Sequence, residues 1–462
     1  MDKGNKFGSD PYNYSYKRAY GVWCKYRIAC WILPIQLLTL SLYTSKMPLM
    51  YRRNIKSTVL AALDDFPVIL INGARQTGKT TLVRGLVEEK MEVRYETLDD
   101  VALLAAVKSD PVGFIKQFSE PVIIDEVQRA PEIFLPIKQA VDTQERPGMF
   151  ILTGSANILT LPRLADSLAG RMAIITLWPL SQGELSGVVE DFITRAFAAE
   201  FSLPDPPPLP RTELLQQIIA GGYPRALAAS TQANRALWFQ SYITELLERD
   251  VRDLSQIRSV TEFPTLLRVL AARSSTLLNL AELSRSTGLQ QDTLKRYYSL
   301  LQALFLVIPQ PAWTANVSRR LMKTPKTTLN DTGLLAHLVG ISERRLSQDN
   351  LLLGQALETF IVNELRKQLT WSDTGAELFH FRDNKGNETD IVLENRGGEV
   401  VGIEVKAAAS LRPEDFKGLD KLSTAAKGRF KRGILIYTGD KVLSFGAHYA
   451  VPIQSLWSSA GL

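Results

Sequence analysis

The sequence contains few of the residues that build disulfide frameworks and soft-metal centres. It has 2 cysteines, Cys24 and Cys30, and 3 histidines, which are His337, His380 and His448. Two cysteines exclude a cysteine-rich scaffold and a cysteine-based zinc site, and the wide spacing of the histidines argues against a histidine cluster. We therefore expect neither a disulfide framework nor a metal centre built from cysteine or histidine.

No strong excess of charge of one sign is present either. The net charge is +6 and the pI about 9.1, with 45% hydrophobic and 22% charged residues, as in ordinary globular proteins. This balance is compatible with a nucleic-acid or acidic partner but does not identify one. The length of 462 residues allows two to four domains, at roughly 100–200 residues per domain.

The sequence also lacks an apolar run long enough for a stable membrane span. The run Ile28–Tyr43 is shorter than the roughly 20 residues that a spanning helix needs, and a proline interrupts it. Basic residues precede this run, as in a signal peptide or a membrane-associating leader. Residues 1–49 are therefore either a leader or an over-extended start. We favour the over-extended start, because organised sequence begins at Tyr51.

Short apolar runs alternate with amphipathic stretches after this segment, which is typical of an α/β domain with a parallel sheet. We expect this domain over 50–202. The proline-rich stretch 203–211 is expected to be a stiff linker, because proline fixes φ and lacks a backbone donor. The predicted strands of the domain are 68–72, 93–98, 121–126, 149–154 and 173–178.

Two further regions follow the linker. Residues 212–340 are expected to be mostly helical, and within 278–307 a helix, a turn at Gly288 and a second helix precede two short apolar runs, as in a winged helix. The polar face of that second helix carries Lys295 and Arg296, which either contact DNA or are solvated. Residues 345–462 restart with a long helix and several strand-like runs, which predicts a second α/β unit.

A phosphate-binding loop is predicted by GARQTGKT over 73–80, which fits the pattern G-x-x-x-x-G-K-[ST]. Its glycines permit backbone conformations in which successive amides point at phosphates, and the following helix adds its N-terminal dipole. Lys79 is expected to reach the β- and γ-phosphates, and the Thr80 hydroxyl to ligate Mg²⁺. The expected nucleotide-binding residues are Gly73, Ala74, Arg75, Gln76, Thr77, Gly78, Lys79, Thr80 and Thr81.

Acidic and polar residues at the ends of two other predicted strands complete the expected site. Asp125 is predicted to hold Mg²⁺, and Glu126 to orient or deprotonate the attacking water. Ser155, in preference to Thr153, is predicted to contact the γ-phosphate or the water. Arg171 is either an arginine finger, acting in cis or from a neighbouring subunit, or a structural salt-bridge partner.

These motifs resemble, in their order, those of one family: the prokaryotic AAA-type ATPases whose C-terminal part has a restriction-endonuclease-like fold. The resemblance covers roughly 50–462 and includes RRN near residue 52, GARQTGKTTL, VIIDEVQRAP, FILTGSAN, LAGRM, the run over 178–184 and GGYPRAL over 221–227. It implies an additional-strand P-loop core, a winged-helix middle and a nuclease-like end. The family pattern does not supply a physiological role.

The expected nuclease-like site lies in ETDIVLENRGGEVVGIEVK over 388–406, whose spacing resembles a PD-(D/E)xK core. Asp390 and Glu404 would bind Mg²⁺, while Lys406 would activate water or stabilise the transition state. Glu404 and Lys406 alternate on one strand and so project from the same face. Glu358, on the preceding helix, would supply a further acid. Such folds also persist as binding modules without catalysis.

Three functional hypotheses follow from these patterns. The first is a cytoplasmic, Mg²⁺-dependent ATPase that couples hydrolysis of ATP to the attached domains. The second is a nucleotide-switched module that binds DNA, and the third is an ATP-gated nuclease. DNA, a protein partner and a homo-oligomer all stay open as partners.

Overall fold

The fold is known from a computed structural model, which describes residues 51–90, 93–144, 146–157, 168–251 and 262–458. Within it, Arg52–Leu462 form one unit. The predicted leader 1–49, with its apolar run, lies outside the described residues. None of the helices in the described ranges combines the length and the apolar character that crossing a membrane requires.

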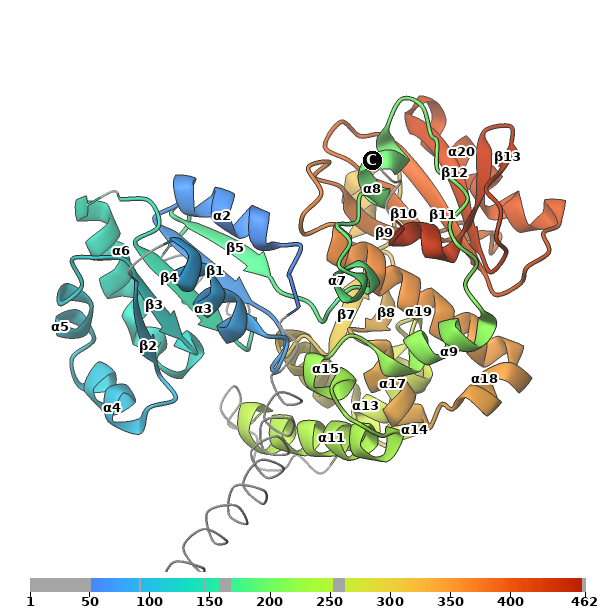
Figure 1. Cartoon of the computed structure of the whole chain (residues 1–462). Helices are drawn as coiled ribbons and strands as arrows, with labels where there is room; N and C mark the ends of the chain where they lie inside the picture. The colour runs from blue at the N-terminus through green and yellow to red at the C-terminus, as the bar shows by residue number, and fades with distance from the viewer. Residues whose placement is uncertain (1–50, 91–92, 145, 158–167, 252–261, 459–462) are drawn as a thin grey trace, which may run out of the picture. The chain divides into compact units, whose positions relative to one another are not determined.

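The first domain is a parallel sheet with helices on both sides (Figure 1). The strand order is β2-β3-β4-β1-β5, so β4 is inserted between β1 and β3. That insertion is the additional strand that the resemblance implied. The elements are α2 (Lys56–Asp65), β1 (Val68–Asn72), α3 (Lys79–Lys90), β2 (Arg94–Thr97), α4 (Val101–Ser109), α5 (Pro111–Lys116), β3 (Val122–Asp125), α6 (Phe134–Gln144), β4 (Phe150–Gly154) and β5 (Met172–Thr176).

Alternation along the strands explains why both faces of this sheet are covered. On β1, Ile69 and Ile71 pack with side chains of α2 and α3. Val68 and Leu70 point to the opposite face, where they pack with α4, α5 and α6. All five residues of β1 are buried, as expected for a central strand of a parallel sheet. The sheet thereby holds the carboxyl ends of β1, β3 and β4 at one edge.

The middle region is mostly helical and contains a small antiparallel sheet of order β6-β8-β7. Residues 201–210, between α8 and α9, are in irregular conformation. Its elements are α7 (Gln182–Ser186), α8 (Phe192–Phe197), α9 (Arg211–Ala220), α10 (Pro224–Leu227), α11 (Gln232–Glu245), a π-helical turn (Leu246–Asp250), α13 (Phe263–Ala272), β6 (Thr276–Leu277), α14 (Leu280–Thr287), α15 (Gln291–Ala303), β7 (Val307–Gln310), α16 (Val317–Arg320), β8 (Lys326–Leu329), α17 (Thr332–Val339) and α18 (Glu343–Gln348).

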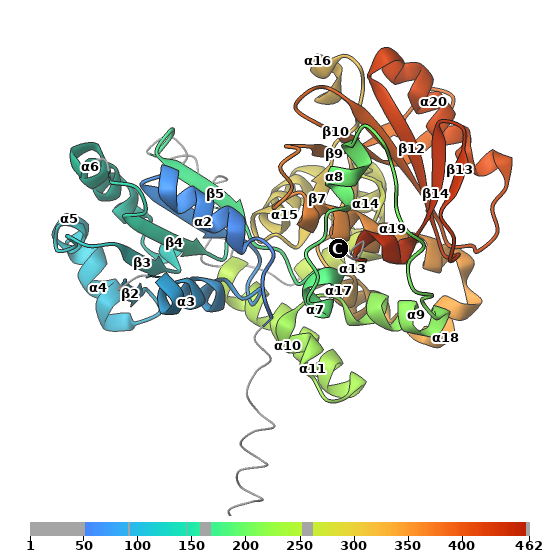
Figure 2. The ribbon, with the colours of Figure 1, turned by 45° about the horizontal axis from the view of Figure 1, so that its top comes forward.

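The C-terminal region is a mixed sheet of order β13-β14-β12-β11-β10-β9 with a helix on each face (Figure 2). Ile391 and Ile403 pack with α19 on one face, and Val392 and Leu422 meet on the other face, where α20 lies. The elements are α19 (Asn350–Gln368), β9 (Glu377–Arg382), β10 (Glu388–Glu394), β11 (Val400–Lys406), α20 (Lys417–Ala426), β12 (Phe430–Tyr437), β13 (Leu443–Phe445) and β14 (His448–Pro452).

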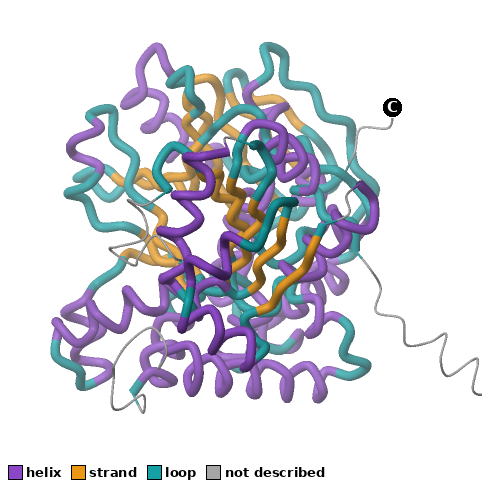
Figure 3. Tube along the Cα trace, turned by 90° about the vertical axis from the view of Figure 1, so that its left-hand side faces the viewer, coloured by secondary structure: helices purple, strands orange, loops and turns teal. Residues whose placement is uncertain are grey.

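The observed strands agree with most of those expected from the sequence, and Figure 3 shows them flanked by helices. All five strands of the first domain lie within two residues of their predicted bounds. The short strands β6, β13 and β14 were not predicted. β6 spans only two residues, and every residue of β13 is exposed, so neither has a buried alternating pattern to reveal it.

Candidate functional site

The loop between β1 and α3 has the backbone of a phosphate-binding loop. Gly73 has φ 143° and Gly78 has φ 96°, conformations that side chains rarely adopt. A Cβ on Gly73 would lie 2.3 Å from the Leu177 carbonyl oxygen, so glycine is required there for space as well. Gln76, at φ 61°, is left-handed too. The loop therefore turns sharply into the N-terminus of α3, where the helix dipole favours an anion.

Side chains of the loop hold it closed. Lys79 is 5% exposed, and its Nζ donates to the carbonyl oxygens of Gly73 and Ala74 at 3.0 and 2.9 Å. Thr77 Oγ1 donates to Ala74 O at 2.9 Å. The lysine ammonium therefore lies within the loop, against the loop's own carbonyls, and its contact with the β- and γ-phosphates stays a prediction. Thr81, one residue beyond Thr80, is exposed.

Asp125 ends β3 and accepts hydrogen bonds from hydroxyl groups. Thr80 Oγ1 lies 3.0 Å from its Oδ2, Tyr95 OH donates at 2.7 Å, and Thr153 Oγ1 donates to its Oδ1. Burial, together with the Asp125 carboxylate, raises the pKa of Tyr95 to about 12, so Tyr95 remains a donor at neutral pH. The predicted pair of Thr80 and Asp125 is thus brought together, next to a tyrosine that the sequence patterns did not single out.

Glu126 follows β3 in a left-handed conformation, with φ 61° and ψ 45°. Its carboxylate accepts from Ser155 Oγ at 3.0 Å and from Gln128 Nε2, and Gln128 Nε2 also contacts Ser155 Oγ at 2.8 Å. Its backbone N–H donates to Thr153 Oγ1 at 3.1 Å. Ser155 and Gln128 therefore fix the direction of the Glu126 carboxylate.

Arg171 is placed differently from the other predicted residues. Its guanidinium pairs with Asp142 on α6, and its side chain is 39% exposed. The structure therefore supplies a partner for the salt-bridge interpretation. It does not bring Arg171 to the phosphate-binding loop within this chain.

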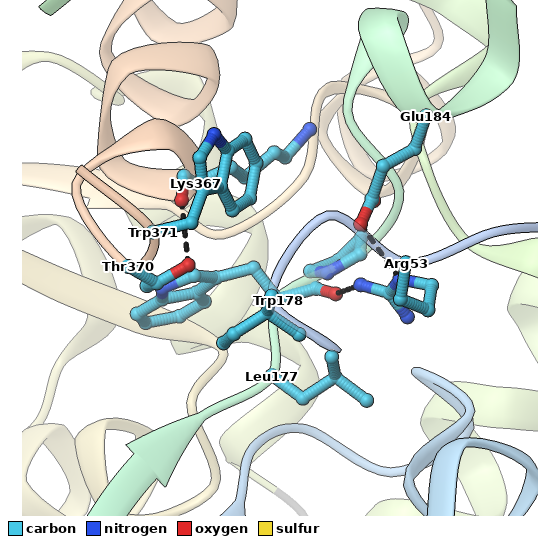
Figure 4. A pocket seen from close by; sticks show the side chains of 9 residues that line it. Arg53, Leu177, Trp178, Glu184, Lys367, Thr370 and Trp371 are labelled. Carbon is cyan, nitrogen blue, oxygen red and sulfur yellow. Dashed lines mark hydrogen bonds and ion pairs between the residues drawn. The ribbon is translucent and has the colours of Figure 1, made fainter. Parts of the chain in front are cut away.

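Contacts tie the phosphate-binding loop to the segments that follow the first sheet. Arg53 donates to the Thr77 carbonyl oxygen at 2.8 Å. It also donates to the Trp178 carbonyl oxygen at 2.6 Å and to Glu184 Oε1 at 2.9 Å (Figure 4). On the loop itself, Arg75 forms an ion pair with Glu245 of α11 at 2.9 Å. The loop is thus linked to α7 through Arg53 and directly to α11.

From α7 the connection continues to the C-terminal region. The Gln182 N–H donates to Glu364 Oε2 on α19 at 2.8 Å, and Lys367 Nζ donates to the Leu180 carbonyl at 2.9 Å. Glu364 is 1% exposed and Lys367 is 6% exposed. Trp371, which follows α19, lines the small pocket in Figure 4 together with Arg53. Buried polar contacts therefore run from the phosphate-binding loop to α19.

The predicted nuclease-like residues converge only in part. Glu358 on α19 and Asp390 on β10 both contact Lys326 Nζ, at 2.6 and 3.4 Å. Burial, followed by the effect of Asp390, raises the pKa of Glu404 well above its ordinary range. Lys406 lies 3.7 Å from Asp415 instead. Lys326 is the cluster member that the sequence patterns did not indicate.

Some residues of both sites could have been found from the sequence and others could not. Arg53 belongs to the RRN run, which was part of the resemblance, and Gln128 belongs to VIIDEVQRAP. Tyr95 and Lys326 carry no local signal, because they lie on strands remote in sequence from the acids that they contact.

Comparisons with known proteins agree with this architecture. Residues 65–186 match a family described as AAA domain. Residues 211–345 and 353–456 match families described as Domain of unknown function, DUF8612 and DUF4143. Similar solved structures include the Walker-type ATPase paby2304 of Pyrococcus abyssi (TM-score 0.41, 15% identity, 63% of this chain and 96% of that one). Another is the RuvB Holliday junction branch migration motor of Thermotoga maritima (TM-score 0.28, 19% identity, 56% and 89%).

The sheet order, the loop and the family match define an AAA-type P-loop domain at the N-terminal side of the described chain. Two curated relatives are Uncharacterized protein Rv2008c of Mycobacterium tuberculosis and Uncharacterized protein Mb2031c of Mycobacterium bovis. Each is 30% identical over 362 residues, which are 78% of this chain and 75% of the relative. The chain belongs to the family of these two mycobacterial proteins.

Proposed function

We propose that the chain is a Mg²⁺-dependent ATPase that couples hydrolysis to its middle and C-terminal regions. The observation that carries the proposal is the contact of Thr80 Oγ1 with Asp125 at 3.0 Å, beside the amides of the loop 73–80. A hydroxyl and a carboxylate are oxygen ligands that suit Mg²⁺, which takes its remaining ligands from phosphates and water. An ATPase needs access to ATP, so the proposal includes a cytoplasmic location.

Each residue of the site has a role in this proposal. The loop amides and Lys79 bind the phosphates, and Thr80 and Asp125 hold the cation. A bound Mg²⁺ neutralises charge on the phosphate oxygens. Glu126, aimed by Ser155 and Gln128, orients the attacking water and takes its proton. Arg171 enters only in a homo-oligomer, where it would reach the nucleotide of a neighbouring subunit.

The coupling in the proposal uses the contacts that leave the loop. The Thr77 carbonyl contacts Arg53, which contacts Glu184, and α7 in turn contacts α19. A change in the loop backbone on hydrolysis therefore has a buried polar route towards the C-terminal region. The ion pair between Arg75 and Glu245 offers a second route, towards α11.

Replacement of Glu126 by glutamine in the full chain tests the proposal. We expect phosphate release from ATP to fall at least about 100-fold, since a positioned base contributes about that much, while nucleotide binding is kept. Glu132→Gln, at an exposed residue, is the matched control. Hydrolysis at the wild-type rate by Glu126→Gln would show that the base is elsewhere. Failure of the wild-type chain to bind ATP with Mg²⁺ would overturn the whole proposal.

A second candidate is DNA binding by the middle region, which would make the nucleotide a switch. The element order α13-β6-α14-α15-β7-α16-β8 resembles that of a winged helix, and this resemblance supports the candidate. The Lys295 side chain is 60% exposed on α15, and Asp292, 3.6 Å away, partly offsets its charge. Lys295→Ala should lower the slope of log affinity for duplex DNA against log salt by about 1, and Lys108→Ala should leave the slope unchanged. Affinity independent of salt would remove this candidate.

A further inference from the structure

The carboxyl cluster of the C-terminal region contains a cation that belongs to the protein itself. Lys326 Nζ lies 2.6 Å from Glu358 Oε1 and 3.4 Å from Asp390 Oδ1. The Lys326 side chain is 6% exposed, and the two acids are 16% exposed. The ammonium therefore lies between two of the carboxylates to which a PD-(D/E)xK site would assign a divalent ion.

Lys326 is fixed in this position by its strand. It begins β8, where it pairs with Gln310 on one side and Leu277 on the other. Gln310 Nε2 in turn donates to the carbonyl oxygens of Phe379 and Asp390 at 2.9 and 2.8 Å. Backbone pairing on both sides of Lys326 keeps its ammonium directed at the acids.

The remaining members of the cluster fit a neutralised network. Asp390 Oδ2 accepts the Val405 N–H at 3.0 Å, so one of its oxygens is engaged by the backbone. Glu404, the third acid of the cluster, is 7% exposed. The Lys326 ammonium, which has three N–H donors, faces both Glu358 and Asp390.

A divalent cation does not fit beside this ammonium. Mg²⁺ needs oxygens at about 2.0–2.1 Å, and one oxygen each of Glu358 and Asp390 already faces the Lys326 ammonium. Two cations a few ångströms apart in a buried cluster also repel strongly. Among the residues that the structure describes, no group of three or more acids, histidines or cysteines is arranged to hold a metal ion.

We propose that Lys326 takes the place of the divalent cation in this cluster. The cluster then fastens β8 to α19 and β10, and it does not support metal-dependent cleavage of nucleic acid. The three-stranded and the six-stranded sheets are joined at this point, because Lys326 belongs to the first and Asp390 to the second. This inference does not depend on the ATPase assignment.

Removal of the ammonium should uncover a cation site. In Lys326→Met, Glu358 and Asp390 lose the ammonium between them, and we expect their carboxylates to turn towards an added Mn²⁺ or Mg²⁺, for which carboxylate oxygens are suitable ligands. Lys323→Met is the matched control, because Lys323 is exposed and contacts the Arg382 carbonyl instead of the acids.

The experiment is a titration of the full chain with Mn²⁺, without nucleotide, followed by electron paramagnetic resonance of free Mn²⁺. Lys326→Met should bind Mn²⁺ at least about tenfold more tightly than the wild type or Lys323→Met. Asp390→Asn in the Lys326→Met background should abolish this gain. Weak binding of Mn²⁺ at Thr80 and Asp125 is common to all variants and cancels when their affinities are compared.

Asp390→Asn in the wild-type background decides the matter even if Lys326→Met does not fold. No loss of Mn²⁺ binding is expected there, because Lys326 already occupies the cluster. A wild-type Mn²⁺ site that disappears in Asp390→Asn would overturn the inference. Equal Mn²⁺ affinity of a folded Lys326→Met and the wild type would overturn it as well.

Discussion

The two acidic sites of this chain differ in what faces the carboxylates. Asp125 is surrounded by the hydroxyls of Thr80, Tyr95 and Thr153. Glu358 and Asp390 face the ammonium of Lys326. A hydroxyl can rotate and offer its oxygen to an arriving cation, whereas an ammonium can only donate and already supplies the charge. An acid lined by hydroxyls is therefore suited to exchange its partners, and an acid paired with a lysine is suited to hold the fold.

The largest expected effect is a loss of stability when Lys326 is replaced. Lys79, the lysine of the phosphate-binding loop, serves as the comparison. Lys326→Met should lower the free energy of unfolding by about 3–5 kcal/mol, because it leaves buried carboxylates without their cation. Lys79→Met should cost less, about 1.5–3 kcal/mol, since the hydrogen bonds of the Lys79 ammonium to the Gly73 and Ala74 carbonyls join a charged donor to neutral acceptors. Urea denaturation followed by circular dichroism measures both. Equal losses would break the contrast between the sites.

For the rate of ATP hydrolysis the order of the two sites should be reversed: replacing Asp125 should matter more than replacing Asp390. Asp125→Asn should reduce Mg²⁺-dependent ATP hydrolysis at least about 100-fold, because it weakens the hold on the cation and its charge stabilisation. Asp390→Asn should leave the hydrolysis rate within about twofold of the wild type, since Asp390 lies outside the nucleotide site. Steady-state phosphate release checks both variants. A large loss in Asp390→Asn would mean that the two sites are coupled during turnover.

A smaller effect is expected from Glu190, a buried acid that accepts hydrogen bonds from Asn54 Nδ2 and from the Gly183 N–H. Burial, opposed by a hydrogen bond to Ser181 and assisted by Glu364, raises the pKa of Glu190 to about 7. Between the ordinary pKa and this value the native state keeps a proton that the unfolded chain loses, so stability falls as pH rises through that window. Glu190→Gln should remove about 2 kcal/mol of this fall between pH 5 and pH 8.

Urea denaturation at a series of pH values measures the slope of the free energy of unfolding against pH for Glu190→Gln and for the exposed control Glu132→Gln. The control should keep the wild-type pH dependence. An unchanged slope in Glu190→Gln would show that other groups cause the decline.

The smallest effect is expected from alanine substitutions at two glycines of the P-loop domain, Gly85 and Gly73. Gly85→Ala on α3 should stabilise the chain by up to about 1 kcal/mol, because alanine favours helix and a Cβ meets nothing within 4 Å. Gly73→Ala should instead weaken nucleotide binding, since its Cβ would collide with the Leu177 carbonyl. Thermal melts and a fluorescent-nucleotide titration separate the two outcomes. A neutral Gly73→Ala would contradict the close approach at the loop.

The sequence indicated the first site well because the signals are local. The apolar strand, the glycines and Lys79 are contiguous, and Asp125 ends a strand whose burial is visible in its composition. In the C-terminal region, alternation along β11 and the helix before it predicted one cluster. Glu358 and Asp390 do share a contact with Lys326, whereas Lys406 lies beside Asp415. The occupant of that cluster was missed, because Lys326 comes from a strand of another sheet, and no local periodicity encodes pairing between remote segments.

The left-handed backbone of Glu126 has a consequence for engineering. A non-glycine residue held in that conformation costs of order 1–3 kcal/mol, which the surrounding structure must offset. Glycine at this position would relieve that cost, so a stability screen would tend to select it. The same substitution removes the carboxylate that Ser155 and Gln128 orient. The variant would therefore be more stable but would hydrolyse ATP more slowly.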